Sequence, residues 1–285
     1  MRAAGPGGRR GKLPGVPGPA DCLLLFTKPA RPGRVKTRLV GASLPGGADG
    51  TVTAARAAAL HAAFLDDLAA RLGRGVERGA FRLRLAWALD AAEPLPTLPE
   101  GLAGIGGVDA VRQAGDDLGA RLHRALAGAA RDHRSVAAVG SDHPTLPLAR
   151  VEEAFAAAAR GRVALGPADD GGYYLIALPA GAVSLGLFAG VAWSTGAVLE
   201  QALARCRAAG LEVELLPPGL DVDEGPDLER LAALLAGSGR PGPASSIGEG
   251  LDCPRTLALL ASWGCFEAGR EAAEPPRRAA AAGRG

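Results

Sequence analysis

Short apolar runs alternate with longer amphipathic stretches along most of this 285-residue chain. Runs typical of buried strands lie at 22–27, 81–89, 135–140, 163–166, 173–178 and 211–216. Helical patterns occupy 48–72, 118–131, 148–160, 196–209 and 226–235. Strands that alternate with helices of this length form βαβ units, which bury a mostly parallel sheet between two helical layers. The predicted fold class is therefore α/β, as a single three-layer α/β/α domain.

The composition changes at both ends of this alternating region. We expect a disordered extension at 1–20, one α/β domain at 21–236, and a disordered tail at 267–285, because both ends lack periodic apolar residues. The segment 237–266 begins with Gly, Ser and Pro and ends in a short apolar stretch from 255. It is predicted to be a linker followed by a short docking helix.

Charge and cysteine usage exclude several classes of protein. A net charge of +2 is too small for a dedicated nucleic-acid binder. No apolar stretch reaches the roughly 18 residues of a membrane span, and the basic segment 1–20 lacks the apolar core of a secretory signal. The four cysteines form no CxxC pair, which argues against structural zinc and a disulfide framework: Cys22, Cys206, Cys253 and Cys265. We expect a cytoplasmic protein with reduced thiols, without nucleic-acid or membrane partners.

A basic loop follows the first strand. Only three of the 32 basic residues of the chain are lysines, and two of these lie in this loop. It carries five cations in eleven residues: Lys28, Arg31, Arg34, Lys36 and Arg38. Lysine and arginine differ in shape and hydration, so lysines kept in an arginine-rich chain suggest that a compact ammonium is needed. The loop is predicted to bind a polyanion such as the phosphates of a nucleotide, with a solvated basic turn as the alternative.

The loop is not a P-loop. That motif requires Gly directly before its Lys-Thr, so that backbone amides can wrap a phosphate. Here Val35 precedes Lys36 and Thr37. The sequence therefore excludes a Walker A site.

Three carboxylates are candidates for a metal site. Asp142 ends an apolar strand, and Asp221 and Asp223 follow a later strand two residues apart, so they point to the same side of an extended chain. Carboxylate oxygens suit Mg²⁺ or Mn²⁺, and a cation would relieve their repulsion. Alternatively, such residues cap helices. The neighbouring His143 could be a ligand or base, but a solvent-facing side chain is more typical of a lone histidine beside a turn.

Further polar segments lie at turns into strands and helices. Gly171 and Gly172 permit close backbone approach to a ligand, and the adjacent tyrosines at 173 and 174 should face opposite sides of a strand. The preferred interpretation of Asp116 or Asp117 is that its side chain caps the helix that follows. The same interpretation applies to Ser194 or Thr195.

Together these segments resemble a family of small bacterial glycosyltransferase-like proteins, the radical-SAM/selenodomain-associated transferases. The family is related to phospholactate guanylyltransferase and the molybdenum-cofactor guanylyltransferases. The resemblance covers about 21–236 and rests on six ordered motifs: 27–39, 113–121, 140–144, 166–174, 193–195 and 221–223. It implies a GT-A nucleotide-diphospho-sugar transferase fold.

The resemblance also implies roles for individual residues. Lys36 and Asp142 would be catalytic, and Asp142, Asp221 and Asp223 would share one Mg²⁺ or Mn²⁺. The nucleotide would contact Lys28, Arg31, Gly33, Lys36, Thr37, Arg38, Gln113, Gly115 and Asp117. The acceptor pocket would be formed by Asp170, Gly171, Gly172, Tyr173, Trp193, Ser194 and Thr195.

Two reactions fit this set of residues. In nucleotidyl transfer an acceptor phosphate attacks the α-phosphorus of an NTP and pyrophosphate leaves. In glycosyl transfer an acceptor attacks the anomeric carbon of a nucleotide sugar and the nucleoside diphosphate leaves. Five loop cations and a single Asp at 142 favour the first, whereas the family resemblance favours the second. A non-catalytic nucleotide-binding protein is the alternative, and a homodimer is one candidate state. The sequence does not identify the acceptor.

Overall fold

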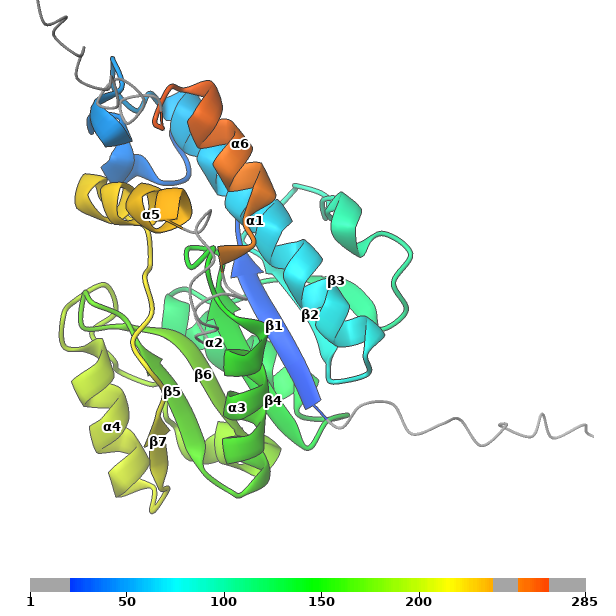
Figure 1. Cartoon of the computed structure of the whole chain (residues 1–285). Helices are drawn as coiled ribbons and strands as arrows, with labels where there is room; N and C mark the ends of the chain where they lie inside the picture. The colour runs from blue at the N-terminus through cyan, green and yellow to red at the C-terminus, as the bar shows by residue number, and fades with distance from the viewer. Residues whose placement is uncertain (1–20, 238–250, 267–285) are drawn as a thin grey trace, which may run out of the picture.

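The computed structural model describes residues 21–237 and 251–266 (Figure 1). The extensions predicted at 1–20 and 267–285 and the linker at 238–250 lie outside the described residues. The remaining chain forms one α/β domain with a central seven-stranded sheet, which confirms the predicted fold class.

The sheet has the order β3-β2-β1-β4-β6-β5-β7. The strands are β1 Asp21–Thr27, β2 Arg82–Trp87, β3 Val108–Arg112, β4 Ser135–Gly140, β5 Val163–Pro167, β6 Tyr173–Pro179 and β7 Val213–Leu215. All neighbouring pairs are parallel except those of β6, which runs antiparallel to β4 and β5. The strand β3 was not predicted from the sequence, because this five-residue edge strand lacks the continuous apolar run of a buried strand.

Helices cover both faces of the sheet. They are α1 Ala54–Glu77, α2 Leu118–Ala129, α3 Leu148–Ala159, α4 Val198–Ala208, α5 Gly225–Gly237 and α6 Pro254–Ser262. Four short 3-10 helices occur in the described part of the chain, two before α1 and two after it: η1 Thr37–Leu39, η2 Pro45–Gly47, η3 Glu100–Leu102 and η4 Ala180–Leu185. Helices α1 and α3 pack on one face and α2 and α4 on the other, which gives three layers.

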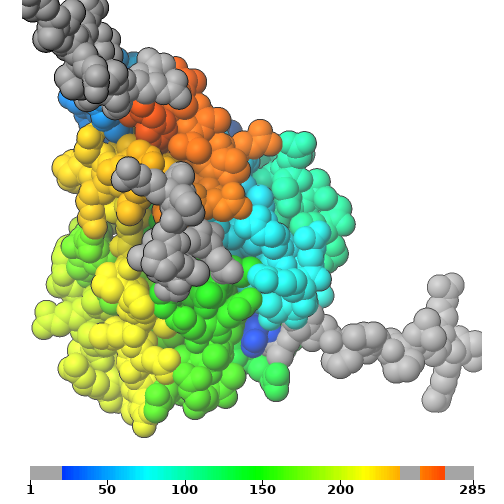
Figure 2. Space-filling view, in the orientation of Figure 1, coloured from blue at the N-terminus to red at the C-terminus, as the bar shows by residue number. Residues whose placement is uncertain are grey.

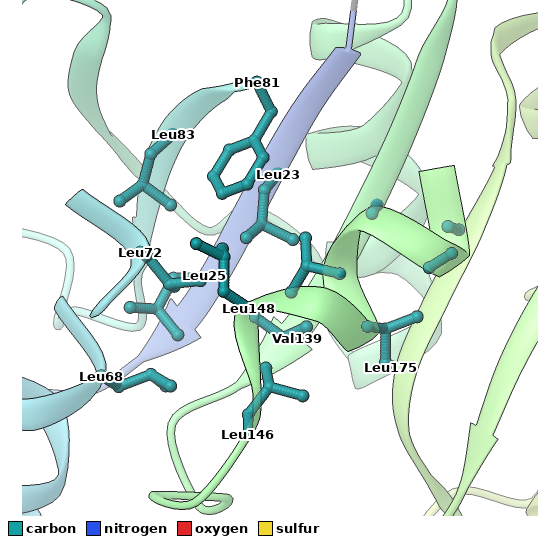
Figure 3. Close-up of a cluster of buried hydrophobic side chains, with 14 of the residues drawn as sticks. Leu23, Leu25, Leu68, Leu72, Phe81, Leu83, Val139, Leu146, Leu148 and Leu175 are labelled. Carbon is teal, nitrogen blue, oxygen red and sulfur yellow. The ribbon is translucent and has the colours of Figure 1, made fainter. Parts of the chain in front are cut away.

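The alternation of side chains along the strands divides the core in two. In β1, Leu23 and Leu25 face α1 and α3, whereas Cys22 and Leu24 face α2 and α4. Figure 3 shows Leu23 and Leu25 within the apolar cluster between the sheet and helices α1 and α3, beside Leu72 of α1. Because successive residues of a strand point to opposite faces, a fully apolar strand serves both layers. The central position of β1 places the loop after Thr27 in the middle of the sheet edge.

A third apolar cluster joins α5 and α6 to the first half of α1. Figure 2 shows α6 at the surface beside α1 and α5. The buried carboxylate of Asp67 in α1 accepts hydrogen bonds from the backbone N–H groups of Arg255 and Thr256, both at 2.9 Å. It thereby caps the amino end of α6, because the side chain of the N-cap residue Cys253 does not bond to the backbone N–H groups of this helix. Helix α6 is thus held to the domain by a specific polar contact as well as by apolar packing.

One arginine connects α6 to the loop after β4. Arg71 of α1 is 1% exposed and donates to the carbonyl oxygen of Pro144 at 2.7 Å and to that of Asp252 at 2.6 Å. Its guanidinium therefore ties the segment before α6 to the loop that follows Asp142. No helix among the described residues is long and apolar enough to cross a membrane.

Candidate active site

The carboxyl ends of β1 and β4 open into a cleft with two adjoining parts. One part, here the basic half, has a volume of about 540 Å³ and is lined by residues of the loop after β1. The other, here the apolar half, has a volume of about 250 Å³ and is lined mainly by β4, β6 and the segment before α4. Five residues border both halves: Phe26, Leu118, Gly140, Asp142 and Ser194. Asp142 is thus the carboxylate at the junction.

Lys36 lies at the floor of the basic half. Its side chain is 1% exposed, and its ammonium forms ion pairs with Asp142 and, at 3.2 Å, with Asp223. It also donates to the carbonyl oxygen of Val222 at 2.6 Å. Burial alone would lower the pKa of Lys36, but the charges of Asp142 and Asp223 outweigh it and raise the pKa. Lys36 is therefore a fixed cation that connects two of the predicted carboxylates.

The same ion pair acts on Asp142, whose side chain is 44% exposed. Burial would raise its pKa, but the charge and the hydrogen bond of Lys36 lower it below the ordinary value. The backbone N–H of Val222 donates to the carbonyl oxygen of Asp142 at 2.9 Å. This bond holds the 221–223 segment against the end of β4, so residues about 80 positions apart in the sequence share one site.

Asp221 is in a different electrostatic state. Burial, followed by the charges of Asp142 and Asp223, raises its pKa to about 8. Lys36 therefore does not neutralise the whole cluster, and the three carboxylates together retain an excess of negative charge. Among the described residues, no group of three or more Asp, Glu, His or Cys side chains is arranged to hold a metal ion. The shared metal site stays a prediction, and the hard oxygen donors fit Mg²⁺ or Mn²⁺ in chemistry.

The remaining loop cations differ in how they are used. Arg31 is paired with Glu93, and Arg34 lies 3.2 Å from Asp90. Within the described part of the chain, Lys28 and Arg38 have no ion pair, although both border the basic half. Lys28, Arg31 and Arg34 also line an outer pocket of about 300 Å³ that includes residues at the end of β2. Of the five cations in the loop, therefore, only two are without an ion pair among the described residues.

Two non-glycine residues have positive φ within 21–237 and 251–266, and both border the cleft. They are Lys36, with φ of 48°, and Ser194, with φ of 64°. Such backbone is strained for residues with a Cβ and is often found at functional sites. The sequence prediction of Ser194 or Thr195 as an N-cap is wrong, because α4 begins at Val198 and its N-cap is Ala197. The hydroxyl of Thr195 instead donates a hydrogen bond to the carbonyl oxygen of Ala192 at 2.7 Å.

Aromatic side chains form the wall of the apolar half. Tyr173 and Trp193 pack edge to face with ring centroids 6.3 Å apart. As expected for strand neighbours, Tyr174 belongs to the opposite core cluster, and it stacks on His143 at 4.7 Å. The expectation that His143 faces solvent is wrong. It is 5% exposed, and burial lowers its pKa to about 4, so it is a neutral packing residue at physiological pH.

The glycine-rich turn before β6 approaches protein rather than open space. A Cβ on Gly171 would lie 2.2 Å from the carbonyl oxygen of Gly196, so this glycine lets the turn pack against the segment before α4. Asp170 accepts from the backbone N–H of Gly172 at 2.9 Å, and both border the apolar half. Gly171 itself is absent from the described lining of either half.

The predicted nucleotide contacts are only partly brought together. Thr37 and Gln113 line the basic half, and Gln113 donates to the carbonyl oxygen of Ala86 at 2.8 Å. Asp117 accepts from the backbone N–H of Ala120 at 2.7 Å, as the cap of α2, which was the first of its expected roles. Gly33, Gly115 and Asp117 are not among the described residues that line the three pockets.

Sequence reasoning missed two polar residues of the basic half. Arg121 donates to the carbonyl oxygen of Gly115 at 3.0 Å and reaches the cleft from α2. His61 of α1 is 3% exposed, with its Nε2 3.0 Å from the carbonyl oxygen of Lys28. The charge of Arg121 within the motif at 113–121 was a usable signal. A single histidine in the middle of a helix gives none.

Comparison with known proteins supplies a family model and similar structures. The model described as "Uncharacterized protein conserved in bacteria (DUF2064)" matches residues 72–195. The crystal structure of a "putative nucleotide-diphospho-sugar transferase" from Desulfovibrio desulfuricans G20 is 30% identical, with a TM-score of 0.63. The alignment covers 86% of this chain and 98% of that protein. No curated protein matches this chain.

Two more distant structures have a lower similarity. A cytidylyltransferase from Leptospira borgpetersenii is 12% identical, with a TM-score of 0.47, over 86% of this chain and 96% of that one. The manganese complex of Rv0371C from Mycobacterium tuberculosis H37Rv is 19% identical, with a TM-score of 0.42, over 75% and 97%. Similarity at this level bears on neither the activity nor the metal of this chain.

Proposed function

This chain belongs to the DUF2064 family, and we propose that it is a metal-dependent transferase that uses a nucleotide substrate. The observation that carries the proposal is the two-part cleft at the carboxyl ends of β1 and β4. Ligands of α/β sheets bind at such an edge. The basic half contains five cations and two carboxylates, and it adjoins an apolar half through Asp142. A phosphate-bearing donor and a second substrate could therefore meet at one carboxylate.

In this proposal the nucleotide phosphates lie in the basic half. Lys28 and Arg38 supply positive charge that no described carboxylate neutralises by an ion pair. Lys36 offsets part of the negative charge of Asp142 and Asp223, which reduces their repulsion of the phosphate oxygens. The similarity to the Desulfovibrio protein, whose name specifies a nucleotide-diphospho-sugar donor, supports the same substrate class.

Asp142, together with Asp221 and Asp223, would hold Mg²⁺ or Mn²⁺. Burial, followed by the negative charges of Asp142 and Asp223, raises the pKa of Asp221 to about 8, and a bound divalent cation would stabilise the charged form of this carboxyl against both effects. A divalent cation bound there would neutralise phosphate oxygens of the leaving group. The task of the protein side chains is to orient the donor along the basic half and to hold the acceptor on the other side of Asp142.

Two reactions are compatible with this arrangement, and their products differ. Nucleotidyl transfer releases pyrophosphate from an NTP, whereas glycosyl transfer releases a nucleoside diphosphate from a nucleotide sugar. We expect the slow background reaction with water to reveal the donor even without the acceptor. The protein would be incubated with each NTP and with nucleotide sugars, with Mg²⁺, Mn²⁺ or EDTA, and both products would be quantified.

A matched variant makes this assay specific. Asp142→Asn should lose the metal-dependent release, whereas Asp169→Asn should retain it, because Asp169 pairs with Arg230 at 2.7 Å outside the described cleft lining. Release that is equal in wild type and Asp142→Asn would contradict the proposed role of Asp142 in the metal-dependent reaction. Nucleotide binding without release under any of these conditions would favour a non-catalytic nucleotide-binding protein.

A further inference from the structure

The two halves of the cleft differ in the sign of their charge. The basic half is bordered by Lys28, Arg34, Lys36, Arg38 and Arg121. Among the described residues that line the apolar half, none is Lys, Arg or His, and the three ionisable acids are Asp142, Asp170 and Asp221. Apart from the hydroxyl-bearing Ser194 and Thr195, the side chains that form the rest of its described wall are apolar or aromatic. The donor and the second substrate therefore enter opposite electrostatic environments.

A phosphorylated second substrate would be poorly accommodated in the apolar half. Recognition of a phosphate requires Arg, Lys or a row of backbone N–H groups, and burial of an anion without such partners is costly. The carboxylate of Asp170 would repel it further. A divalent cation at Asp142 would not supply the missing charge, because its positive charge would be taken up by the carboxylates and by the donor phosphates.

We propose that the apolar half binds an uncharged or cationic acceptor with an apolar ring or chain and a hydroxyl or amine nucleophile, and that it excludes phosphorylated acceptors. This inference rests on the proposed function and narrows its substrate class. The Tyr173–Trp193 pair offers aromatic faces on which such a ring can pack, and Asp142 lies where the nucleophile would meet the donor. The volume of about 250 Å³ suits a small molecule or one end of a larger one.

Trp193 gives a local readout of binding. Its indole packs closely on α2, because a Cβ on Gly119 would lie 2.5 Å from Nε1 of Trp193. The chain has three tryptophans. Protein labelled with 5-fluorotryptophan therefore gives three ¹⁹F resonances, and the one lost in Trp193→Phe reports on the apolar half. The resonances of Trp87 and Trp263 serve as internal controls.

The test compares three probes of one shape: benzyl alcohol, benzylamine and benzyl phosphate. Each is titrated into the labelled full-length protein with saturating Mg²⁺ and nucleoside diphosphate, so that the basic half is filled. We expect the alcohol and the amine to shift the Trp193 resonance saturably, and the phosphate to bind at least about tenfold more weakly. Benzyl phosphate that binds as well as benzyl alcohol, or the absence of any shift by the alcohol and the amine, would overturn the proposal.

Asp170→Asn tests the contribution of charge. Asparagine retains the oxygen that accepts from Gly172, so the turn should stay intact. We expect the variant to bind benzyl phosphate about threefold to tenfold more tightly than wild type and benzylamine more weakly. Asp169→Asn, which removes the neighbouring carboxylate outside the pocket, should change neither affinity. Unchanged discrimination in Asp170→Asn would show that this carboxylate does not set the preference.

The proposed function is tested separately in the same samples. A thermal-shift titration with UDP, GDP, CDP and ADP in the presence of Mg²⁺ measures nucleotide binding before any acceptor probe is added. If no nucleotide binds, the proposed function fails, whatever the probes do. If a nucleotide binds and the probes show no preference against phosphate, only the acceptor inference fails.

Discussion

The two halves of the cleft are built in different ways. Loop side chains supply four of the five cations that border the basic half, and three of the five loop cations already have carboxylate partners within the protein. Strands β4 and β6 and the segment before α4 form most of the apolar half, and the ring of Tyr173 packs on Trp193. Most of the loop cations therefore have to exchange a carboxylate partner of the protein for a ligand phosphate. The apolar half, in contrast, has a shape that is fixed by the packing of its side chains.

Exposure separates the loop cations further. The side chain of Lys36 is 1% exposed, whereas those of Arg31 and Arg34 are 52% and 67% exposed. A buried ion pair that loses one partner leaves a charge without compensation, but an exposed pair contributes little. Charge in a sequence thus indicates where a polyanion could bind, and burial decides which of those charges matter. The following predictions test this difference.

The largest effect is expected for Asp142→Asn, at the junction of the halves. The substitution keeps the shape of the side chain but removes the charge that a metal ion requires, so metal-dependent turnover should fall by about a hundredfold or more, or roughly 2.7 kcal/mol. The melting temperature should change little, because Lys36 keeps Asp223 and the carbonyl oxygen of Val222 as partners. Product release and thermal unfolding are the measurements. Normal turnover, or a collapsed melting temperature, would make Asp142 a structural residue.

Lys36→Ala should weaken nucleotide binding by roughly tenfold to a hundredfold. Without the ammonium, Asp142 and Asp223 would repel the phosphates at the centre of the site. Titration calorimetry with a nucleoside diphosphate and Mg²⁺ measures this loss directly. Lys36→Arg should not restore full affinity, because a planar guanidinium does not fit the place of a compact ammonium that is 1% exposed. Wild-type affinity in Lys36→Ala would contradict the assignment of the phosphates to the basic half.

Asp67→Ala should lower the free energy of unfolding by about 2 kcal/mol, because a buried carboxylate that caps α6 is lost. The hydroxyl of Thr256, which donates to Asp67 at 2.7 Å, loses its partner as well. Asp66→Ala, one residue away on the exposed side of α1, is the matched control. Urea unfolding measures both. Since α6 does not line either half of the cleft within the described residues, nucleotide affinity of the folded Asp67→Ala protein should stay within about twofold of wild type.

Equal stability of the two aspartate variants would contradict the capping role. A large loss of nucleotide affinity in folded Asp67→Ala would mean that α6 acts on the site through Arg71. The bonds of Arg71 to Pro144 and to Asp252 provide the physical route for such coupling.

The sequence was sufficient to predict the strands and helices that contribute most to the core. The apolar runs at 22–27 and 135–140 became β1 and β4, because a short continuous apolar run is typical of a strand that is buried on both faces. The edge strand β3 was missed because only half-buried and exposed positions form it. The antiparallel direction of β6 follows from the tight turn between Pro167 and Tyr173, and a periodicity argument carries no information on direction.

The candidate site was predicted in its components but not in its pairing. The sequence assigned Asp142 and Asp223 to one metal and Lys36 to the nucleotide, whereas in the structure one ammonium, that of Lys36, pairs with both carboxylates. Pairings between residues far apart in the chain depend on tertiary packing, which no local pattern encodes. The same reason explains His143, whose burial depends on its stacking against Tyr174.

The smallest effect is expected for Arg34→Ala. Arg34 and Asp90 lie 3.2 Å apart with side chains 67% and 71% exposed, so solvent and salt screen their charges. Nucleotide affinity measured by calorimetry should fall by no more than about threefold, and less at higher salt. The complementary variant Asp90→Ala frees the guanidinium and should raise affinity by a similarly small factor. A loss greater than about tenfold in Arg34→Ala would mean that Arg34 leaves Asp90 to bind phosphate in a desolvated site. The ligand would then rearrange the side chains of the basic half. The difference in burial between Arg34 and Lys36 would not predict which of them contributes more to nucleotide affinity.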